Sequence, residues 1–243
     1  MLKKILIVLL IILCGFLYYQ VSSPYYSDSL IGGNVVRENV FVERVLDGDT
    51  IETNIGKIRL LGINTPEKGM PYYNEARILL QNLVLNKSVD LDIIKGNEKD
   101  KYGRTLAYVF LGDFFVNKEI LNQGLANFYS YEEDLYTSEL NDVDKTARFN
   151  ELGIWKKSDK FGCVKLVKLK YEETTRCNNE EELVLENNCG ESFEITIKDD
   201  ANHIYRETLN EGLWTKNFSC VWNNVGDRLF VWTRDGQVIF HSY

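Results

Sequence analysis

Hydrophobic residues are distributed along the chain in three different patterns. An unbroken apolar run from Ile5 to Tyr19 comes first. Between residues 39 and 157, short alternating runs typical of strands are mixed with segments whose apolar residues recur at helical spacing. From residue 162 onward only short alternating runs remain, separated by turns. The pattern therefore predicts a leading apolar segment, a mixed domain and an all-β domain.

The mixed domain, residues 39–157, is predicted to be mainly β with α. Its expected strands are Val40–Leu46, the two arms of a hairpin turning at Gly56, Val89–Ile94 and Leu106–Leu111. Its expected helices are Tyr72–Asn86, Val116–Gly124 and Leu135–Leu152. Five strands closed as a small barrel, with three helices, accommodate this order of elements.

Polar side chains are concentrated at the strand ends around the hairpin. Asp47-Gly48-Asp49-Thr50 is typical of a turn, because glycine tolerates positive φ and aspartate hydrogen-bonds nearby backbone. Pro66 has no N–H to give to a sheet and ends the second arm. We expect these strand ends to bring four side chains to one site: Asp49, Arg59, Asn64 and Glu67.

These residue types suit metal-assisted hydrolysis of a phosphodiester. Carboxylate and amide oxygens are ligands for Ca²⁺ or Mg²⁺, and a planar guanidinium matches two phosphate oxygens. Glu67 could then hold or deprotonate a water. The structural alternative is that Asp47 and Asp49 only form turns and that Arg59 is a solvated strand residue. The first histidine is His203, which excludes histidine-based catalysis from the mixed domain.

Three sequence blocks carry a resemblance to a known family. They are Asp47–Thr50 with Arg59–Glu67 (DGDT and RLLGINTPE), Asp100–Tyr108 (DKYGRTLAY) and Asn122–Ala126 (NQGLA), with Trp155 following. In this order they resemble the staphylococcal nuclease (thermonuclease) family over residues 39–157. The resemblance implies an OB-fold barrel and a calcium-dependent nuclease, for which both DNA and RNA are candidate substrates.

The resemblance also implies roles for individual residues, carried over by position. Asp49, Asn64 and the Thr65 main-chain carbonyl correspond to calcium ligands, and Asp47 supports them without binding the metal. Arg59 and Arg104 correspond to the pair that stabilises the reacting phosphate, and Glu67 to the residue that positions the attacking water. The tyrosines that correspond to nucleotide contacts are Tyr102, Tyr129 and Tyr131.

Asn64 departs from the family pattern, because the best-known members have a second calcium-binding aspartate there. An amide keeps the carbonyl ligand but removes a charge, so metal binding is expected to be weaker or altered in selectivity. The net charge of −8, which includes −5 over residues 38–157, disfavours tight nonspecific DNA binding. The alternative function is a noncatalytic nucleic-acid or surface-binding module on a nuclease-like fold.

Residues 1–21 are predicted to be a signal peptide or a membrane anchor, with a linker at 22–38. Lys3 and Lys4 precede the apolar run, and a positive flank favours an N-terminus on the cytoplasmic side. The length of the run lies between that of a signal-peptide core and a transmembrane helix, so both alternatives stay open. Either one places the remaining chain outside the cytoplasm, secreted or held at the membrane.

Residues 162–243 resemble the lamin-tail domain, an immunoglobulin-like β-sandwich, in the blocks Glu182–Asn187, Val221–Asp227 and Arg234–Val238. Trp222 and Trp232 are expected to be core residues. The resemblance implies a binding or tethering role and leaves the ligand of this domain unknown. The strands expected here are Val164–Tyr171, Leu183–Glu186, Phe193–Ile197, Ile204–Tyr205, Leu229–Trp232 and Val238–His241.

Four of the five cysteines, Cys163, Cys177, Cys189 and Cys220, fall in this second domain. In an exported domain they suggest two disulfides, for which three pairings are open. A zinc site is one alternative, although the spacing lacks a C-x₂-C pair. Free buried thiols are the other.

Overall fold

The computed structural model describes residues 35–130, 132–171, 181–200, 203–219, 221–222 and 227–242. Val36–Tyr243 forms one compact unit. The predicted leading segment (1–21), the linker (22–38) up to residue 34, Tyr131, Cys177 and Cys220 lie outside the described residues. Within the described ranges no helix is long and apolar enough to cross a membrane.

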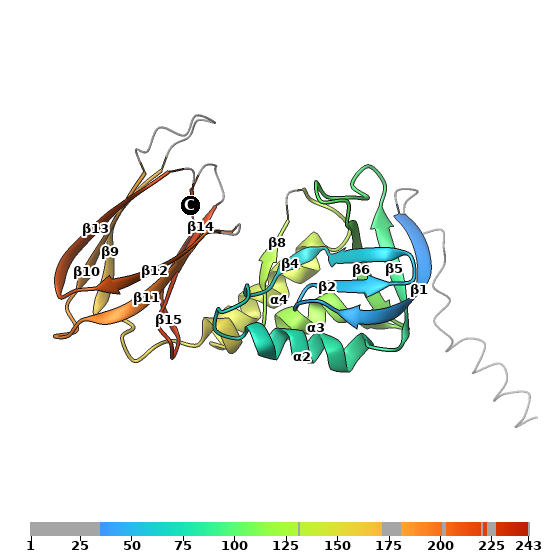
Figure 1. Ribbon diagram of the computed structural model, residues 1–243, viewed down its shortest axis with the longest axis horizontal. Coiled ribbons are helices and arrows are strands. Elements are labelled where there is room, and N and C mark those ends of the chain that lie inside the picture. The colour runs from blue at the N-terminus through green and yellow to red at the C-terminus, as the bar shows by residue number, and fades with distance from the viewer. Residues whose placement is uncertain are drawn as a thin grey trace, which may run out of the picture. The chain divides into compact units, whose positions relative to one another are not determined.

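The first half of the described chain is a closed barrel (Figure 1). Its strands run in the order β3-β2-β1-β5-β6-β7, and β3 also pairs with β6, which closes the sheet on itself. The strands are β1 (Val35–Val45), β2 (Thr50–Thr53), β3 (Gly56–Leu60), β5 (Ser88–Ile94), β6 (Thr105–Leu111) and the two-residue β7 (Phe114–Phe115). The five-stranded barrel predicted from the sequence is confirmed, and closure leaves few unpaired backbone groups at an edge.

Alternation in the strands directs one set of side chains into the barrel. Ile51, Ile58, Leu60, Leu91 and Val109 are fully buried there. In the second hairpin arm, Ile58 and Leu60 therefore lie on the buried face, and Arg59 lies on the opposite face. Burying these aliphatic side chains stabilises the fold by about 1.5–3 kcal/mol each.

Three helices accompany the barrel, as predicted, with shorter bounds. They are α2 (Tyr73–Val84), α3 (Val116–Asn122) and α4 (Thr137–Phe149). The prediction of Leu135–Leu152 for the last helix is too long, because Glu151 has a positive φ and Gly153–Trp155 forms a 3-10 turn, η1. Ala76, Leu80 and Val84 are the buried positions of α2, at the helical spacing of four.

Two three-residue strands missed by the sequence analysis form a separate pair beside the barrel. β4 (Gly62–Asn64) runs antiparallel to β8 (Asn127–Tyr129), with Asn64 opposite Asn127. Strand β4 follows β3 after a single residue. It therefore places Asn64 beside the barrel, close in the chain to Arg59.

The C-terminal domain is β-rich, and its buried side chains form one cluster shared by two antiparallel sheets. One sheet has the order β13-β10-β9, and the other β12-β11-β14-β15. The prediction that Trp222 and Trp232 are buried is correct. Strand β13 was not predicted. The bounds are β9 (Val164–Lys170), β10 (Glu181–Asn187), β11 (Phe193–Lys198), β12 (Ile204–Leu209), β13 (Gly212–Phe218), β14 (Arg228–Trp232) and β15 (Gln237–Ser242).

A disulfide joins Cys163 to Cys189, across a separation of 26 residues. Cys163 therefore pairs with Cys189, one of the partners that the sequence left open for it. Because both thiols are in the disulfide, neither cysteine can be a zinc ligand.

A third buried cluster joins the barrel region to the C-terminal domain. Met70, Ala147, Ile154 and Trp155 pack in one cluster with Phe230 and Trp232. The indole Nε1 of Trp232 donates a hydrogen bond of 3.1 Å to the main-chain oxygen of Ile154. The C-terminal domain is therefore packed against the segment after β4, against α4 and against η1.

Candidate active site

The loop between β1 and β2 holds Asp49 in place. Asp47 accepts a hydrogen bond from the Asp49 main-chain N–H through its Oδ1, at 3.2 Å, which is the turn predicted from the sequence. Gly48 is needed for close approach, since a Cβ there would lie 2.7 Å from Ala76 Cβ and 2.8 Å from Thr65 Oγ1. The loop is thereby pressed between helix α2 and the residue that follows β4.

Asp49 is the centre of the cluster and is only 6% exposed. Its Oδ2 accepts hydrogen bonds of 2.9 Å from both the N–H and the hydroxyl of Thr65. Its Oδ1 accepts from the Thr50 hydroxyl at 3.2 Å. These neutral donors satisfy a buried carboxylate without fully cancelling its charge.

Arg59 joins Asp49 to Asn64. Its terminal nitrogen lies 3.2 Å from Asp49 Oδ2 and donates to Asn64 Oδ1 at 3.3 Å. Its other terminal nitrogen donates to the Leu60 main-chain oxygen at 2.6 Å. Asp49 Oδ2 and Asn64 Oδ1 therefore both contact the same nitrogen of the Arg59 guanidinium.

Arg104 approaches the same loop from the segment between β5 and β6. Its Nε donates to Asp100 Oδ2 at 2.6 Å, and a terminal nitrogen reaches the Thr50 hydroxyl at 3.4 Å. Burial opposes the ionised form of Asp100, but the hydrogen bonds from Arg104 prevail and lower its pKa. The guanidinium also lies 5.4 Å from the ring centroid of Tyr102.

Glu67 is half-buried just beyond Pro66. Burial and the neighbouring charge of Asp49 raise its pKa, whereas Lys198, Arg59 and Arg104 act in the opposite direction. The predicted carboxylate and both predicted arginines therefore lie within electrostatic reach of one another. Burial, with the Asp49 charge second, also raises the pKa of Asp47 to about 6.

The predicted nucleotide-contacting tyrosines are separated in the structure. Tyr102 is 67% exposed beside Arg104, and Tyr129 is half-buried at the end of β8, opposite Gly62. Tyr131 is outside the described residues. The two described tyrosines thus come from the two segments that border the Asp49 cluster.

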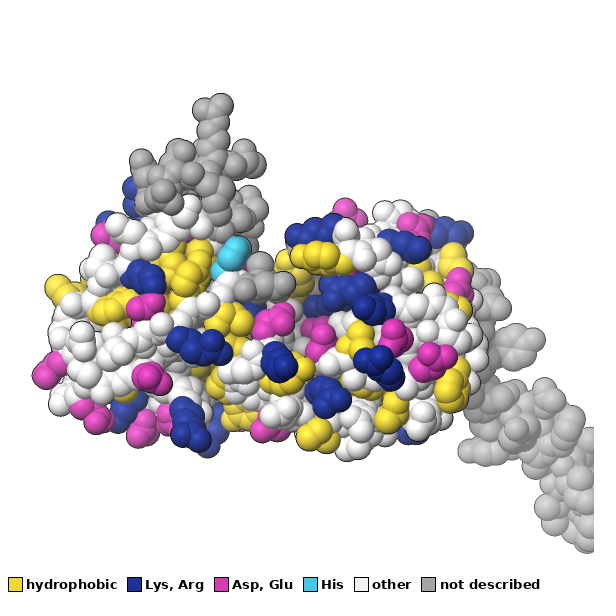
Figure 2. Space-filling view, in the orientation of Figure 1, with side chains coloured by type: hydrophobic (Ala, Val, Ile, Leu, Met, Phe, Trp, Pro, Cys, Tyr) yellow, Lys and Arg dark blue, Asp and Glu magenta, His cyan; other side chains and the backbone are white. Residues whose placement is uncertain are grey.

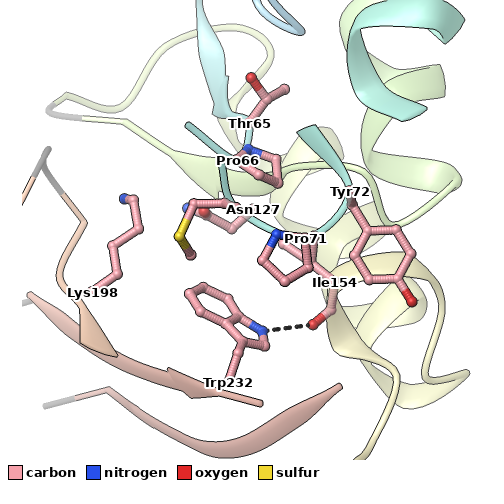
Figure 3. A pocket seen from close by; sticks show the side chains of 9 residues that line it. Thr65, Pro66, Pro71, Tyr72, Asn127, Ile154, Lys198 and Trp232 are labelled. Atoms are coloured by element: carbon pink, nitrogen blue, oxygen red, sulfur yellow. Dashed lines mark hydrogen bonds between the residues drawn. The ribbon is translucent and has the colours of Figure 1, made fainter. Parts of the chain in front are cut away.

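The C-terminal domain contacts the Asp49 cluster, which the sequence did not predict. Asn64 donates a hydrogen bond of 2.9 Å from its side-chain nitrogen to the main-chain oxygen of Asp200. Lys198 is 3% exposed and lines a small cavity together with Thr65 and Asn127 (Figure 3). The sequence offered only a charged run after a strand, Lys198-Asp199-Asp200, and nothing in it links that run to the barrel.

Comparison with known proteins places the chain in a family. The family model described as staphylococcal nuclease homologue matches residues 57–157. The protein named thermonuclease from Staphylococcus intermedius is 32% identical over 164 residues, which cover 63% of this chain and 95% of the relative. The chain belongs to the staphylococcal nuclease family. A thermonuclease from Staphylococcus hyicus is 34% identical (62% of this chain, 94% of the relative), and endonuclease YncB from Bacillus subtilis 35% (52% and 69%).

A nuclease of this family is metal-dependent, and the donors in the cluster fit a hard divalent cation. Asp49 Oδ2 and Asn64 Oδ1 already converge on one cationic nitrogen of Arg59, and the Thr65 carbonyl is adjacent in the chain. Among the described residues there is no group of three His, Cys, Asp or Glu side chains suited to a metal. The two oxygens that face the Arg59 nitrogen come from one carboxylate and one amide, so they carry one negative charge between them.

Proposed function

We propose that this protein is a calcium-dependent nuclease that hydrolyses phosphodiester bonds of DNA, with RNA as a further substrate. Family membership supports a nuclease-like function. The single observation that supports the proposed site is the convergence of Asp49 and Asn64 oxygens on the Arg59 guanidinium. Asp49, Asn64 and the Thr65 carbonyl would hold the ion, with Asp47 supporting the loop.

The chain's own residues supply binding, orientation and proton transfer. Arg59 and Arg104 bind the non-bridging oxygens of the phosphate and stabilise the charge that develops on them. Glu67 orients a water for in-line attack and accepts its proton. The raised pKa of Glu67 brings that carboxyl nearer to the working pH of a general base. Calcium held by Asp49, Asn64 and the Thr65 carbonyl would supply Lewis-acid charge to the phosphoryl group. The P–O5′ bond breaks as the water oxygen bonds to phosphorus, and the leaving 5′-oxygen takes a proton from solvent. Cleavage is therefore expected to leave a 3′-phosphate end and a 5′-hydroxyl end.

The decisive experiment measures cleavage of single-stranded DNA and of RNA by the purified chain, with Ca²⁺ and with a chelator. Arg59→Ala, Arg104→Ala and Glu67→Gln are each expected to reduce the rate by about 10²–10³-fold, the scale for removing a fixed charge-stabilising group. Arg44→Ala is the matched control, because the Arg44 side chain is 70% exposed and forms an ion pair with Glu52 on the neighbouring strand.

Two results would overturn the proposal. Near-normal rates in the Arg59 or Arg104 variant would show that the role assignments are wrong. Retained nucleic-acid binding without cleavage, under any divalent cation, would establish the noncatalytic binding module instead.

Export is part of the same proposal. We infer that residues 1–21 direct the chain out of the cytoplasm, as a signal peptide or as a membrane anchor. The Cys163–Cys189 disulfide supports an oxidising compartment. Extracellular calcium in the millimolar range would also load a site with few charged ligands. A lamin-tail-like binding role for residues 162–243 remains a proposal without a named ligand.

A further inference from the structure

The end of strand β11 reaches the nuclease site. Asp200, which lies two residues after β11, accepts the hydrogen bond from Asn64 through its main-chain oxygen at 2.9 Å. Both partners are nearly buried, at 8% exposure for Asn64 and 7% for Asp200. A hydrogen bond shielded from water in this way has a well-defined geometry and is costly to leave unmade.

This hydrogen bond decides which way the Asn64 amide faces. Its Oδ1 accepts from Arg59, a group that can only donate, and its nitrogen donates to a carbonyl, which can only accept. Turning the amide over would oppose donor to donor and acceptor to acceptor. Asp200 therefore keeps Asn64 Oδ1 directed toward Asp49 and Arg59, where the proposed ion would bind.

An aspartate could not take the same place. It has no proton to give to the Asp200 carbonyl at neutral pH, and it would set a carboxylate against that oxygen. The asparagine that departs from the family pattern is thus the residue type that the C-terminal domain requires.

Arg228 holds Asp200 against the site. Its Nε donates to both carboxylate oxygens of Asp200, at 2.8 and 2.7 Å. A terminal nitrogen of the same guanidinium donates to the Phe128 main-chain oxygen at 2.6 Å. Phe128 is opposite Ile63 in the β4–β8 pair, so Arg228 connects Asp200 to the strand that neighbours Asn64.

Lys198 adds a buried amino group on the same side. It lines the cavity of about 20 Å³ with Thr65, Pro66 and Asn127, a space large enough for about one water (Figure 3). Its Nζ donates to the Asp199 main-chain oxygen at 2.9 Å. Burial lowers the pKa of Lys198, and the charges of Asp199, Asp200 and Glu67 oppose that shift.

We propose that the C-terminal domain is part of the nuclease site, with Asp200 and Arg228 as positioning residues that fix the metal ligand Asn64. The inference rests on the proposed function in that Asn64 is taken as a calcium ligand. Groups that orient a metal ligand commonly change metal affinity by 10–100-fold. The C-terminal domain is therefore required for full calcium affinity, in addition to any ligand that it binds itself.

The test compares Arg228→Gln with Arg234→Gln in the full chain, by calorimetric titration with Ca²⁺. Arg234 is the matched control, an exposed arginine in the turn that follows β14. Arg228→Gln is expected to weaken calcium binding by about tenfold, and the control to leave it unchanged. In an Asn64→Ala background, Arg228→Gln is expected to have no further effect, because its target is gone.

A second readout needs neither metal nor substrate. Hydrogen exchange of the metal-free protein is expected to become faster in peptides covering Gly62–Thr65 in Arg228→Gln, and not in Arg234→Gln.

Should Arg228→Gln fail to fold, Arg228→Lys is the second variant. It keeps the charge but cannot donate to both Asp200 and Phe128 as the planar guanidinium does. Unchanged calcium affinity and unchanged exchange in the Arg228 variants would overturn the inference. Calcium binding without any cleavage by the wild type would overturn the proposed function alone.

Discussion

At the scale of the residue, repulsion between neighbouring carboxylates limits which side chain position 64 can carry. Asp47 and Asp49 are already close, and burial together with the Asp49 charge raises the pKa of Asp47 to about 6. A third carboxylate at position 64 would add to this repulsion. The asparagine avoids that cost, and in addition it makes the hydrogen bond to the Asp200 carbonyl.

Asp227 carries a similar electrostatic cost in the C-terminal domain and offers a test by pH. Its Oδ1 accepts from the N–H groups of Arg228 and Asp200, yet burial raises its pKa from 3.8 to about 6. A carboxyl with a raised folded-state pKa destabilises the fold above that pKa and has no such effect below the unfolded value. Asp227→Asn keeps the acceptor oxygen and removes the charge. It is expected to raise the melting temperature at pH 8.

That gain is expected to shrink as the pH falls from about 6 and to vanish near pH 4, in differential scanning calorimetry across this range. Asp113→Asn, in the exposed turn before β7, is the control for removing a surface carboxylate. A gain that is the same at pH 8 and pH 4 would show that the charge of Asp227 is not its source.

At the scale of the elements, the sequence predicted what periodicity can report. The barrel strands, the hairpin at Gly56 and the three helices follow from alternation and helical spacing. Strands β4 and β8 were missed because three residues are too few to show a period. The clustering of Asp49, Arg59 and Asn64 followed from their places at strand ends, and motif resemblance added Arg104. The contacts of Lys198, Asp200 and Arg228 could not be predicted, because they depend on how two distant segments pack.

The connection after α3 contains a glycine that the packing demands. Gly124 has φ +65°, and a Cβ there would lie 2.3 Å from the Leu152 main-chain oxygen. Its own oxygen accepts a hydrogen bond of 2.8 Å from Ile154 N–H, so the backbone cannot easily retreat. Gly112 has nearly the same φ, +61°, but nothing within 4 Å of the added Cβ. The two glycines differ in surroundings and not in conformation.

Gly112→Ala is therefore expected to cost about 1 kcal/mol, the penalty for a left-handed residue alone. Gly124→Ala is expected to cost about 3 kcal/mol or more, because the close contact adds to the same penalty. Urea denaturation of both variants measures the difference. Equal losses would mean that the contact between Gly124 and Leu152 is relaxed at no cost.

At the scale of the whole molecule, substrate capture must be local. The chain carries a net charge of −8, and the face in Figure 2 shows lysine and arginine side chains interspersed with acidic ones. An acidic protein gains little long-range attraction for a polyanion. Arg59, Arg104 and the bound cation would have to attract the nucleic acid at the site itself. Weak binding elsewhere on the surface is compatible with turnover, because tight binding of the product would slow its release.

The disulfide provides a test that connects the two domains. Cys163 precedes β9 and Cys189 follows β10, so the bond closes a loop of 26 residues at one end of their sheet. Constraining a loop of that length is expected to stabilise the folded state by about 3 kcal/mol. The variant Cys163→Ala/Cys189→Ala should therefore unfold its C-terminal domain at a lower urea concentration. Calcium affinity should decline over the same urea range, since Asp200 and Arg228 belong to that domain.

Reduced wild-type protein is the control and should behave as the double variant does. Undiminished calcium binding after the C-terminal domain has unfolded would show that the barrel holds Asn64 in place unaided.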